Sequence, residues 1–273
     1  MRIISPILRG VRSIVSHRDL LRRLVWRDIQ GRYRGSAGGL GWAIITPLVL
    51  LSVYTFVFSF VLKSRWVGVP NQDSHATYAI MCFSGLIVYS VFTECISRAP
   101  TLMTGNVNYV KKVVFPLEIL PIVSLGSALF HFAIGFTVLM VFIVVFGSGV
   151  PATAWAAWLV LPPLMLWCIG LGWILSSLGV FLRDLGQLVT LVLSVLMFAT
   201  PIFYSADSLP EQYRIYMDLN PLSFVIGTLR ETVILGRYPD PLSYFQHLFP
   251  GILVAVFGMW WFEHTRGGFA DVL

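Results

Sequence analysis

Residues 119–182 read "ILPIVSLGSALFHFAIGFTVLMVFIVVFGSGVPATAWAAWLVLPPLMLWCIGLGWILSSLGVFL" and contain no Asp, Glu, Lys or Arg. One helix needs about 20 apolar residues to cross the hydrocarbon core of a bilayer, so this stretch is too long for a single span. The segment "GSGVPATA" (147–154) interrupts it with glycines and a proline, which favour a turn. We therefore predict two membrane helices, near 119–146 and 154–182, joined by a tight hairpin.

The rest of the chain has the same character. It has 273 residues, of which 57% are hydrophobic and 12% are charged, whereas about 25% of the residues of a soluble domain are charged. This composition predicts an all-α integral membrane protein with six transmembrane helices in a single domain, residues 1–273. The other four spans are expected near 37–62, 76–96, 185–206 and 242–262.

Two segments fit neither a span nor a simple loop. In "HRDLLRRLVWRDIQGRYR" (17–34) apolar residues recur at helical spacing, which predicts an amphipathic interface helix at the membrane surface. Residues 207–236 lie between the fifth and sixth spans. Their apolar part, 222–229, is too short to cross a bilayer and predicts an external re-entrant segment. An ordinary external loop is the alternative.

Basic residues indicate the orientation of the spans. With the amino terminus inside, the inner segments hold fourteen Lys and Arg residues and the outer segments hold five. The positive-inside rule therefore places both termini in the cytoplasm. The net charge of +6 suits anionic lipid at the inner surface. No basic and aromatic pattern indicates nucleic acid, so we expect no nucleic-acid partner.

Motifs for nucleotide binding, catalysis and metal binding are missing from the sequence. The glycines of "RDIQGRYRGSAGGLGW" (27–42) lack the lysine and the spacing of the loop G-x-x-x-x-G-K-[ST], so they predict a bend between helices rather than an ATP site. There is no H-E-x-x-H or G-x-S-x-G motif, and Cys82, Cys95 and Cys168 show no C-x-x-C spacing. We expect no catalytic residue, no metal site and no cofactor bound to this chain.

His131 is the only histidine deep in an uncharged run. An intramembrane histidine either bonds to a neighbouring helix in its neutral form or takes part in a proton relay. Ion-driven carriers usually hold several carboxylates inside the membrane. Here Glu94 and Glu118 fall only at the predicted inner ends of the second and third helices, which disfavours ion coupling.

One inner loop is distinctive. "SRAPTLMTGNVNYVKKVVFPLEILP" (97–121) has prolines near both ends and room for a short polar helix between them. Such a helix is suited to docking on a separate motor protein. Composition alone leaves a plain loop equally open.

Four blocks of sequence resemble one family. They are "RDIQGRYRGSAGGLGWAIITPLVLLSVYTFVFSFV" (27–61), "NVNYVKKVVFPLEILP" (106–121), "RDLGQLVTLVLSVLMFATPIFYS" (183–205) and "LNPLSFVIGTLRETVI" (219–234). Together and in this order they resemble the membrane (permease) subunit of type-2 ABC exporters for lipid-linked polysaccharide. This group includes the O-antigen and teichoic-acid permeases.

The resemblance implies a homodimer in the bacterial cytoplasmic (inner) membrane, paired with two copies of a separate ATPase that binds ATP and Mg. The chain itself would then be no enzyme. The cargo would be a polysaccharide, O-antigen first, linked to polyprenyl pyrophosphate. Residues 99–112 would form the coupling helix, and its ATPase-contacting residues would be Thr101, Met103, Asn106, Asn108, Tyr109, Lys111 and Lys112.

Two further sets of residues have weaker support. The interface helix carries arginines that would meet either the lipid pyrophosphate or, equally well, anionic lipid in general: Arg22, Arg23, Arg27, Arg32 and Arg34. Aromatic rings suit the lining of a glycan channel, and Tyr54, Tyr89 and Tyr204 are candidates. Packing against lipid or other helices is the alternative for each of them.

Two other functions remain open. An integral-membrane enzyme acting on polyprenyl-linked sugars would need a cluster of carboxylates or histidines at one membrane face, and the sequence shows only scattered groups. An ion-coupled flippase for lipid-linked glycans would need carboxylates within the spans.

Overall fold

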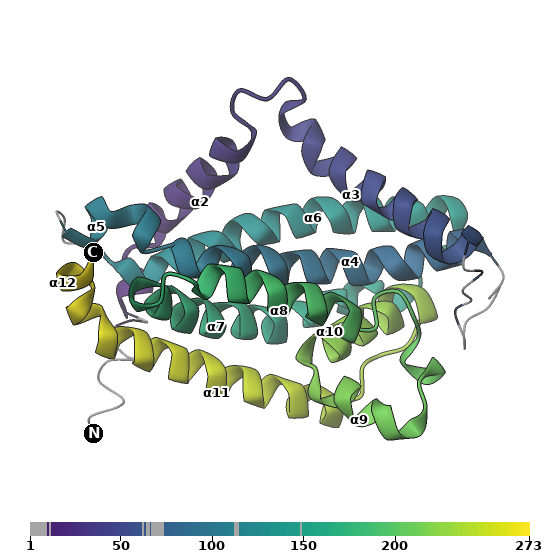
Figure 1. The fold of residues 1–273 in the computed structure, drawn as a ribbon. Coiled ribbons are helices and arrows are strands. Elements are labelled where there is room, and N and C mark those ends of the chain that lie inside the picture. The colour runs from purple at the N-terminus through teal and green to yellow at the C-terminus, as the bar shows by residue number, and fades with distance from the viewer. Residues whose placement is uncertain are drawn as a thin grey trace.

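The structure is a computed structural model, and Figure 1 shows its fold. Every regular element in the described part of the chain is a helix. The described residues are 10, 12–61, 63, 66, 74–111, 115–147 and 149–273.

Eleven α-helices are named in chain order. They are α2 (Arg18–Tyr33), α3 (Trp42–Tyr54), α4 (His75–Arg98), α5 (Val107–Lys111), α6 (Leu120–Phe146), α7 (Leu161–Phe181), α8 (Leu185–Ala199), α9 (Glu211–Leu219), α10 (Pro221–Arg230), α11 (Pro241–Thr265) and α12 (Phe269–Val272). Helix α3 continues as a π-helix, Thr55–Val61, and a 3-10 helix, Ala152–Val160, leads into α7.

Within the described residues, five helical stretches are long and apolar enough to cross a membrane. They are Gly39–Val61, His75–Thr101, Leu117–Phe146, Ala152–Phe181 and Pro241–Val272. They correspond to five of the predicted spans, and the all-α membrane fold is confirmed.

The fifth predicted span, 185–206, differs from the expectation. Helix α8 has 15 residues and ends at Ala199, so it is about 22 Å long, shorter than the roughly 30 Å hydrocarbon core. It ends there because Pro201 forces the preceding residue out of helical geometry. Thr200 is accordingly extended, with φ −103° and ψ 140°. A sixth complete crossing therefore stays a prediction.

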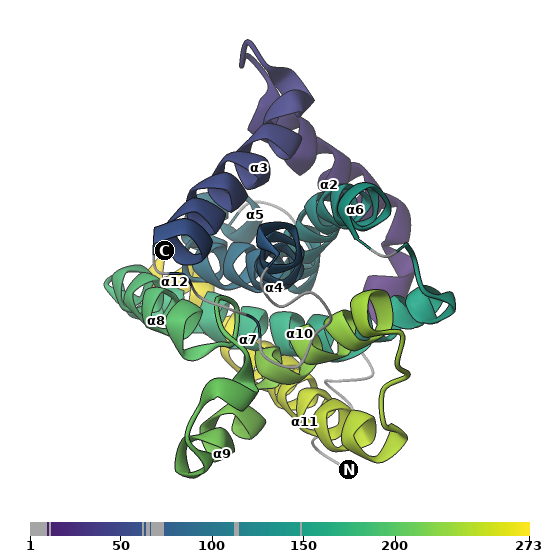
Figure 2. The ribbon, with the colours of Figure 1, turned by 90° about the vertical axis from the view of Figure 1, so that its right-hand side faces the viewer.

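Helix α4 lies at the centre of the molecule. Figure 2 shows it surrounded by α3, α6, α7, α8 and α10. In the most apolar 18 residues of its span 78% of the residues are buried, against 11% in the span that contains α3. The apolar face of α3 is thus left for lipid or for another protein chain.

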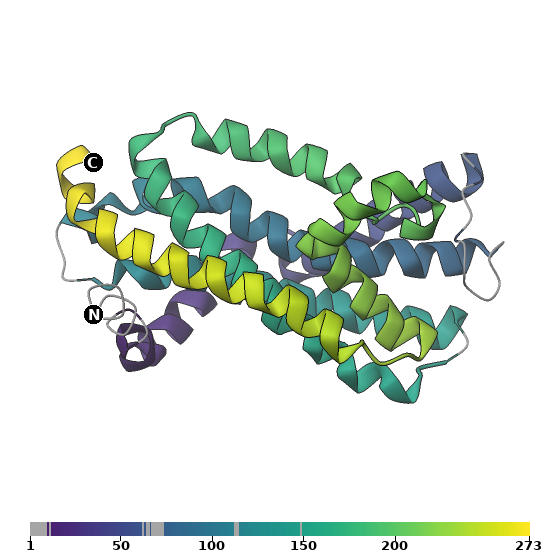
Figure 3. The same cartoon turned by 90° about the horizontal axis from the view of Figure 1, so that it is seen from below.

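Helices α7 and α11 pack closely along their length (Figure 3). A Cβ atom added at Gly258 would lie 2.3 Å from the carbonyl oxygen of Gly170. Close approach of two backbones at small residues is the usual way in which membrane helices gain packing energy without a hydrophobic driving force.

Helices α2 and α3 form an inverted V over α4 and α6, with the bend at its apex (Figure 1). Two of the glycines at the apex, Gly35 and Gly39, have φ of 85° and 47°. Glycine adopts such left-handed backbone geometry at no steric cost. The bend predicted from the sequence is therefore present.

Residues 207–236, predicted as an external re-entrant segment and called the outer segment here, form short helices beside α4 and α11 at the end of the molecule opposite α5 (Figure 1). Their external position stays a prediction. By its sequence Arg230 counts among the outer-loop charges, but the structure buries its side chain, which is 7% exposed. The guanidinium lies 4.4 Å from the centre of the Trp66 ring. Gly85 makes room for it on α4, since a Cβ there would lie 3.0 Å from Arg230 Nη2.

Arg230 donates hydrogen bonds to two backbone carbonyls outside any helix, those of Pro201 and Ile202, and to one within α4. Its Nη1 donates to the carbonyl of Pro201 at 2.6 Å, and its Nη2 donates to Ile202 at 3.1 Å and to Met81 at 2.9 Å. The next carbonyl, that of Phe203, accepts a hydrogen bond from Tyr78 at 2.8 Å. Non-helical backbone is tolerated at membrane depth only when its polar groups are bonded within the protein, and Arg230 meets this condition.

We predict that Arg230→Met lowers the free energy of unfolding by about 3 kcal/mol or more, because each buried polar group left without a partner costs about 1–3 kcal/mol. Arg230→Lys should recover only part of the loss, since one ammonium cannot reproduce the planar set of donors. Thermal unfolding of the purified protein, followed by tryptophan fluorescence, measures both changes. The exposed Arg237 is the control, and an Arg230→Met protein that melts like Arg237→Met would contradict the prediction.

Candidate functional site

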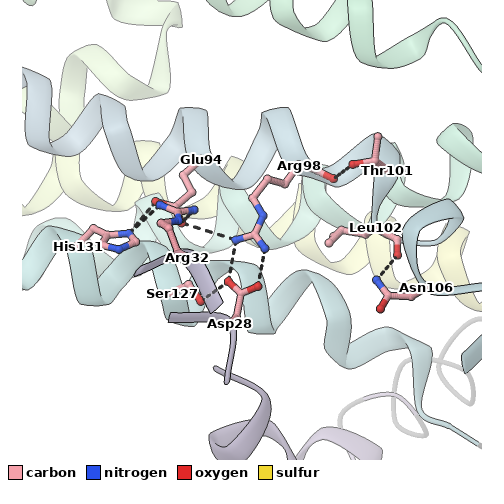
Figure 4. A network of polar contacts seen from close by, with 9 residues as sticks. All are labelled: Asp28, Arg32, Glu94, Arg98, Thr101, Leu102, Asn106, Ser127 and His131. Atoms are coloured by element: carbon pink, nitrogen blue, oxygen red, sulfur yellow. Dashed lines mark hydrogen bonds and ion pairs between the residues drawn. The ribbon is translucent and has the colours of Figure 1, made fainter. Parts of the chain in front are cut away.

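A network of charged side chains joins α2, α4 and α6 near the α5 end of the molecule (Figure 4). Arg98 on α4 forms a bidentate pair with Asp28 on α2, with N–O distances of 2.8 and 2.6 Å. Ser127 on α6 donates to the same carboxylate at 2.6 Å. Three helices that are distant in sequence are thus held at one point.

Glu94 is the second centre of the network. One carboxylate oxygen lies 2.6 Å from Arg32 Nη2, and the other lies 2.9 Å from His131 Nδ1. Arg98 Nη1 is 3.7 Å from the first oxygen. The other nitrogen of the imidazole, His131 Nε2, lies 2.8 Å from the hydroxyl of Tyr33.

Helical spacing explains why these side chains meet. Asp28 and Arg32 are four residues apart on α2, and Glu94 and Arg98 are four residues apart on α4, so each pair shares one face of its helix. Asp28 meets Arg98 while Arg32 meets Glu94, which requires α2 and α4 to run in opposite directions. Two carboxylates and two guanidinium groups then balance their charges.

The partial burial of these charged groups determines how much their pairing stabilises the fold. The side chain of Glu94 is 13% exposed and that of His131 is 15% exposed. Burial raises the pKa of Asp28, which lies on α2 outside the spans, but the hydrogen bonds from Arg98 and Ser127 together with the charges of Arg98 and Arg32 lower it below its ordinary value of 3.8. Removing one partner from such a pair costs more than the pair contributes, because a buried charge is left alone.

This arrangement bears on the two roles considered for His131. The imidazole bonds to Tyr33 of α2 and to Glu94 of α4, so it links helices, as the first interpretation proposed. Glu94 and His131 also form an acid–imidazole pair within the spans. Because Arg32 and Arg98 also contact Glu94, the pair is part of an ion-pair network rather than an isolated relay.

The predicted coupling region, 99–112, forms two 3-10 turns followed by the short helix α5. Asn108 and Lys111 are exposed and Asn106 is partly exposed, while Lys112 lies outside the described residues. Thr101 is also exposed, and its hydroxyl donates to the carbonyl of Arg98 at 3.1 Å. Most of the predicted contact residues therefore have access to the surface.

Met103 differs from the expectation. Its side chain is fully buried in an apolar cluster with Trp173, Phe262 and Phe269. The cause is the chain path, because the turn at 102–103 brings this side chain under α7 and α11. Met103 thus anchors the segment and is not placed to touch an ATPase.

Tyr109 ties the same segment to α2. Its ring stacks on Phe115 with centroids 4.4 Å apart, and its hydroxyl accepts a hydrogen bond from Arg27 Nη1 at 2.9 Å. The segment is thus attached to α4 by continuity of the chain and to α2 by a side-chain contact.

The five arginines predicted on the interface helix, four of them on α2 and Arg34 just after it, do not form one cluster. Arg27 bonds to Tyr109, and Arg32 bonds to Glu94. Arg22 and Arg23 are exposed and line a groove of about 810 Å³ beside Trp26. Arg34 is exposed at the bend.

The three candidate channel tyrosines also differ from one another. Tyr89 is 6% exposed, and its hydroxyl donates to the carbonyl of Leu193 on α8. It packs inside the protomer because the central α4 is covered on that side by α8, so it does not face a channel between subunits. Tyr54 and Tyr204 are half-buried: the Tyr54 ring lies 4.8 Å from Phe203, and the Tyr204 hydroxyl donates to Phe198 at 3.0 Å.

Sequence reasoning missed Asp28, Arg98, Ser127 and Arg230. The acid-then-base order at spacing four, present in both α2 and α4, is a signal that could have suggested the first pairing. Nothing local marks Ser127 or Arg230, whose partners are 99 and up to 149 residues away.

A double-mutant cycle of Asp28→Asn and Arg98→Met should give a coupling of about 1–3 kcal/mol, as expected for charge-assisted hydrogen bonds. The coupling should be unchanged from pH 7 to pH 5. A lowered carboxyl pKa keeps its stabilisation above the unfolded value near 3.8 and loses it only as the pH falls through the folded value. Unfolding of the purified wild-type and variant proteins at both pH values measures the coupling energy. A coupling energy of zero would contradict the pairing of Asp28 with Arg98.

The sequence is similar to those of known membrane transport proteins. Residues 19–234 match the family model described as ABC-2 type transporter. The chain is 28% identical over 258 residues to an O-antigen export system permease protein RfbA of Klebsiella pneumoniae, covering 93% of this chain and 95% of the relative. The protein of the same name from Myxococcus xanthus is 26% identical, covering 97% and 99%. Polysialic acid transport protein KpsM of Escherichia coli is 24% identical, covering 81% and 83%. The match to most of the chain, together with the all-helical membrane fold, shows that this protein belongs to the ABC-2 type transporter family.

Proposed function

We propose that this chain is the channel-forming subunit of an ATP-driven exporter that moves a polyprenyl-pyrophosphate-linked polysaccharide, O-antigen first, across the bacterial inner membrane. The observation that carries the proposal is the segment 99–111. It has an exposed polar surface, is continuous with the central α4, and is fastened to α2 through Tyr109 and Arg27. A motor protein that pushes this segment would move both helices.

The relatives support the cargo. Two of them are named for O-antigen export and one for polysialic acid transport. A hydrated glycan cannot cross hydrocarbon unaided, because each polar group loses several kcal/mol of hydrogen bonding. A channel between two copies of this chain meets that need, and the exposed apolar face of α3 supplies surface for lipid and for the second copy.

ATP and Mg belong in this proposal to two copies of a separate ATPase, and this chain binds neither and catalyses no reaction. The amino-terminal end of α2 and the carboxyl-terminal helix α12 both lie at the α5 end of the molecule (Figure 1). That end is the cytoplasmic one if the positive-inside rule holds. Arg22 and Arg23, in the groove on α2, are placed to meet phosphate of the lipid carrier or of membrane lipid.

In this proposal the charged network at Glu94 transmits movement of the segment 99–111 to α2 and α6. Closure of the ATPase dimer on ATP displaces the segment 99–111, and the displacement passes through Arg98 and Asp28 to α2 and on to Ser127 of α6. Charged pairs between helices have discrete arrangements, so they suit a two-state device. The outer segment at the opposite end then opens the exit.

One observation favours the second candidate, an ion-coupled flippase. Glu94 and His131 form the intramembrane acid–imidazole pair that proton coupling would use. The guanidinium groups of Arg32 and Arg98 beside the same carboxylate favour a structural role. The carboxylates and the imidazole of the same network are the kind of cluster that an enzyme acting on polyprenyl-linked sugars would need, but their pairing with Arg32, Arg98 and Ser127 favours a structural role over catalysis as well.

We predict that the double variant Asn108→Ala and Lys111→Ala weakens binding of the partner ATPase roughly tenfold, as truncation of contact residues commonly does. Glycan-dependent ATP hydrolysis should fall with it. The measurement is co-purification of the two subunits, with hydrolysis assayed in proteoliposomes. Gln212→Ala is the control, because Gln212 is an exposed polar residue of α9 at the opposite end. A chain that transports glycan without retaining any ATPase would sink the proposal.

A second experiment separates the two driving forces. In proteoliposomes that contain the complex, we expect transport of lipid-linked glycan to require ATP and to continue when an ionophore collapses the proton gradient. Transport that stops with the gradient while ATP is present would instead identify the Glu94–His131 pair as a proton site.

A further inference from the structure

The outer end of the molecule contains a cavity of about 430 Å³ that the transport proposal does not use. The post-α8 segment, α9, α10 and the beginning of α11 contribute its walls, and Met81 of α4 and Trp66 also line it. Its volume lies in the roughly 300–1,000 Å³ range of small-ligand sites. It is also formed within one protomer, so it needs no second subunit to be complete.

The buried part of the cavity combines aromatic and cationic groups. Arg230 lies above the Trp66 ring, and both side chains line the cavity. Phe224 also lines it, with His247 stacked on its ring at a centroid distance of 4.1 Å and an angle of 4°. The hydrogen bonds of Arg230 to Pro201 and Ile202 hold this part in place.

The remaining lining is rich in carboxylates. Asp207, Asp218 and Glu231 border the cavity together with Arg237. Glu231 is half-buried, and burial raises the pKa of its carboxyl. Three carboxylates against two guanidinium groups leave a formal charge of −1, with histidine neutral.

The charged and aromatic groups that line the cavity favour some classes of ligand over others. The net negative charge disfavours phosphate and other anions. A divalent cation is also disfavoured, because the described residues hold no group of three or more His, Cys, Asp or Glu side chains able to bind a metal. Sugar hydroxyls both donate and accept hydrogen bonds, so they suit carboxylates and guanidinium groups placed side by side. The C–H face of a sugar ring packs on an aromatic face, and in the stacked Phe224–His247 pair each ring covers only one face of the other.

We propose that this cavity is a saccharide-binding site, which holds an uncharged sugar unit of the exported chain at the outer end of each subunit. The proposal rests on the proposed export of polysaccharide and adds a place where the chain is held. Because Arg230 and Pro201 line the cavity, an occupant contacts the same groups that hold the outer segment on α4. Glycan at the exit would therefore stabilise the arrangement of the outer helices.

The test uses the permease–ATPase complex in nanodiscs. The probe is the cells' own envelope polysaccharide, released from lipid by mild acid, and binding is read by saturation-transfer NMR and by the shift in melting temperature. The variant is Asp218→Asn with Glu231→Gln, which keeps the shape of the lining and changes its charge. Glu211→Gln is the matched control, an exposed acid on α9 outside the lining.

We expect the glycan to bind the unaltered complex and the control equally, and to bind the double variant about tenfold more weakly, because neutral amides replace the two charged acceptors of hydrogen bonds from sugar hydroxyls. Melting without glycan should be equal for all three, which separates loss of the site from loss of the fold. Equal glycan binding by the double variant and the control, or no binding to the intact complex, would overturn the site. If transport still proceeds in that case, the export function stands and only the cavity assignment fails.

Discussion

The structure depends on the hydrogen bonds made by the backbone carbonyls that follow the end of α8. Helix α8 ends at Ala199, short of the bilayer thickness, and the chain continues through Thr200, Pro201, Ile202 and Phe203 without regular hydrogen bonding. Such backbone would be costly at membrane depth if its polar groups had no partners. Arg230 and Tyr78 supply the donors, and Gly85 makes room beside them. The short helices that follow Phe203 can therefore pack against the central α4.

The opposite end of α4 is fixed by a different interaction. Glu94 and Arg98 hold α2 and α6 through Arg32, Asp28, His131 and Ser127. One helix is thus tied at its two ends by charged groups with separate partners. At one end the partners include α2, which also contacts the exposed segment 99–111 through Tyr109. At the other end the partner is α10, which borders the cavity. Helix α4 thus connects these two groups of contacts at opposite ends of the molecule.

Membrane helices gain little from apolar contacts with one another, because lipid tails are equally apolar. Specific packing must come from close backbone approach and from polar contacts. This chain uses both, with Gly170 and Gly258 between α7 and α11 and the ion pairs around α4. The exposed apolar residues of α3 and α8 remain available for lipid or for another protein chain.

Long uncharged runs were enough to predict the helical membrane fold, and helical periodicity and glycine content were enough to predict a helix at α2 and the bend after it, because hydropathy and periodicity are local properties. The family was also recognisable from four blocks of sequence. The partners of Asp28, Glu94 and Arg230 were decided only by the tertiary structure, since those contacts join residues 28 to 149 positions apart along the chain. For the same reason a residue that looks like a surface charge, Arg230, proved buried, and one that looks like a docking residue, Met103, proved to be an anchor. Burial depends on which helices come to lie beside a side chain, and local sequence does not contain that information.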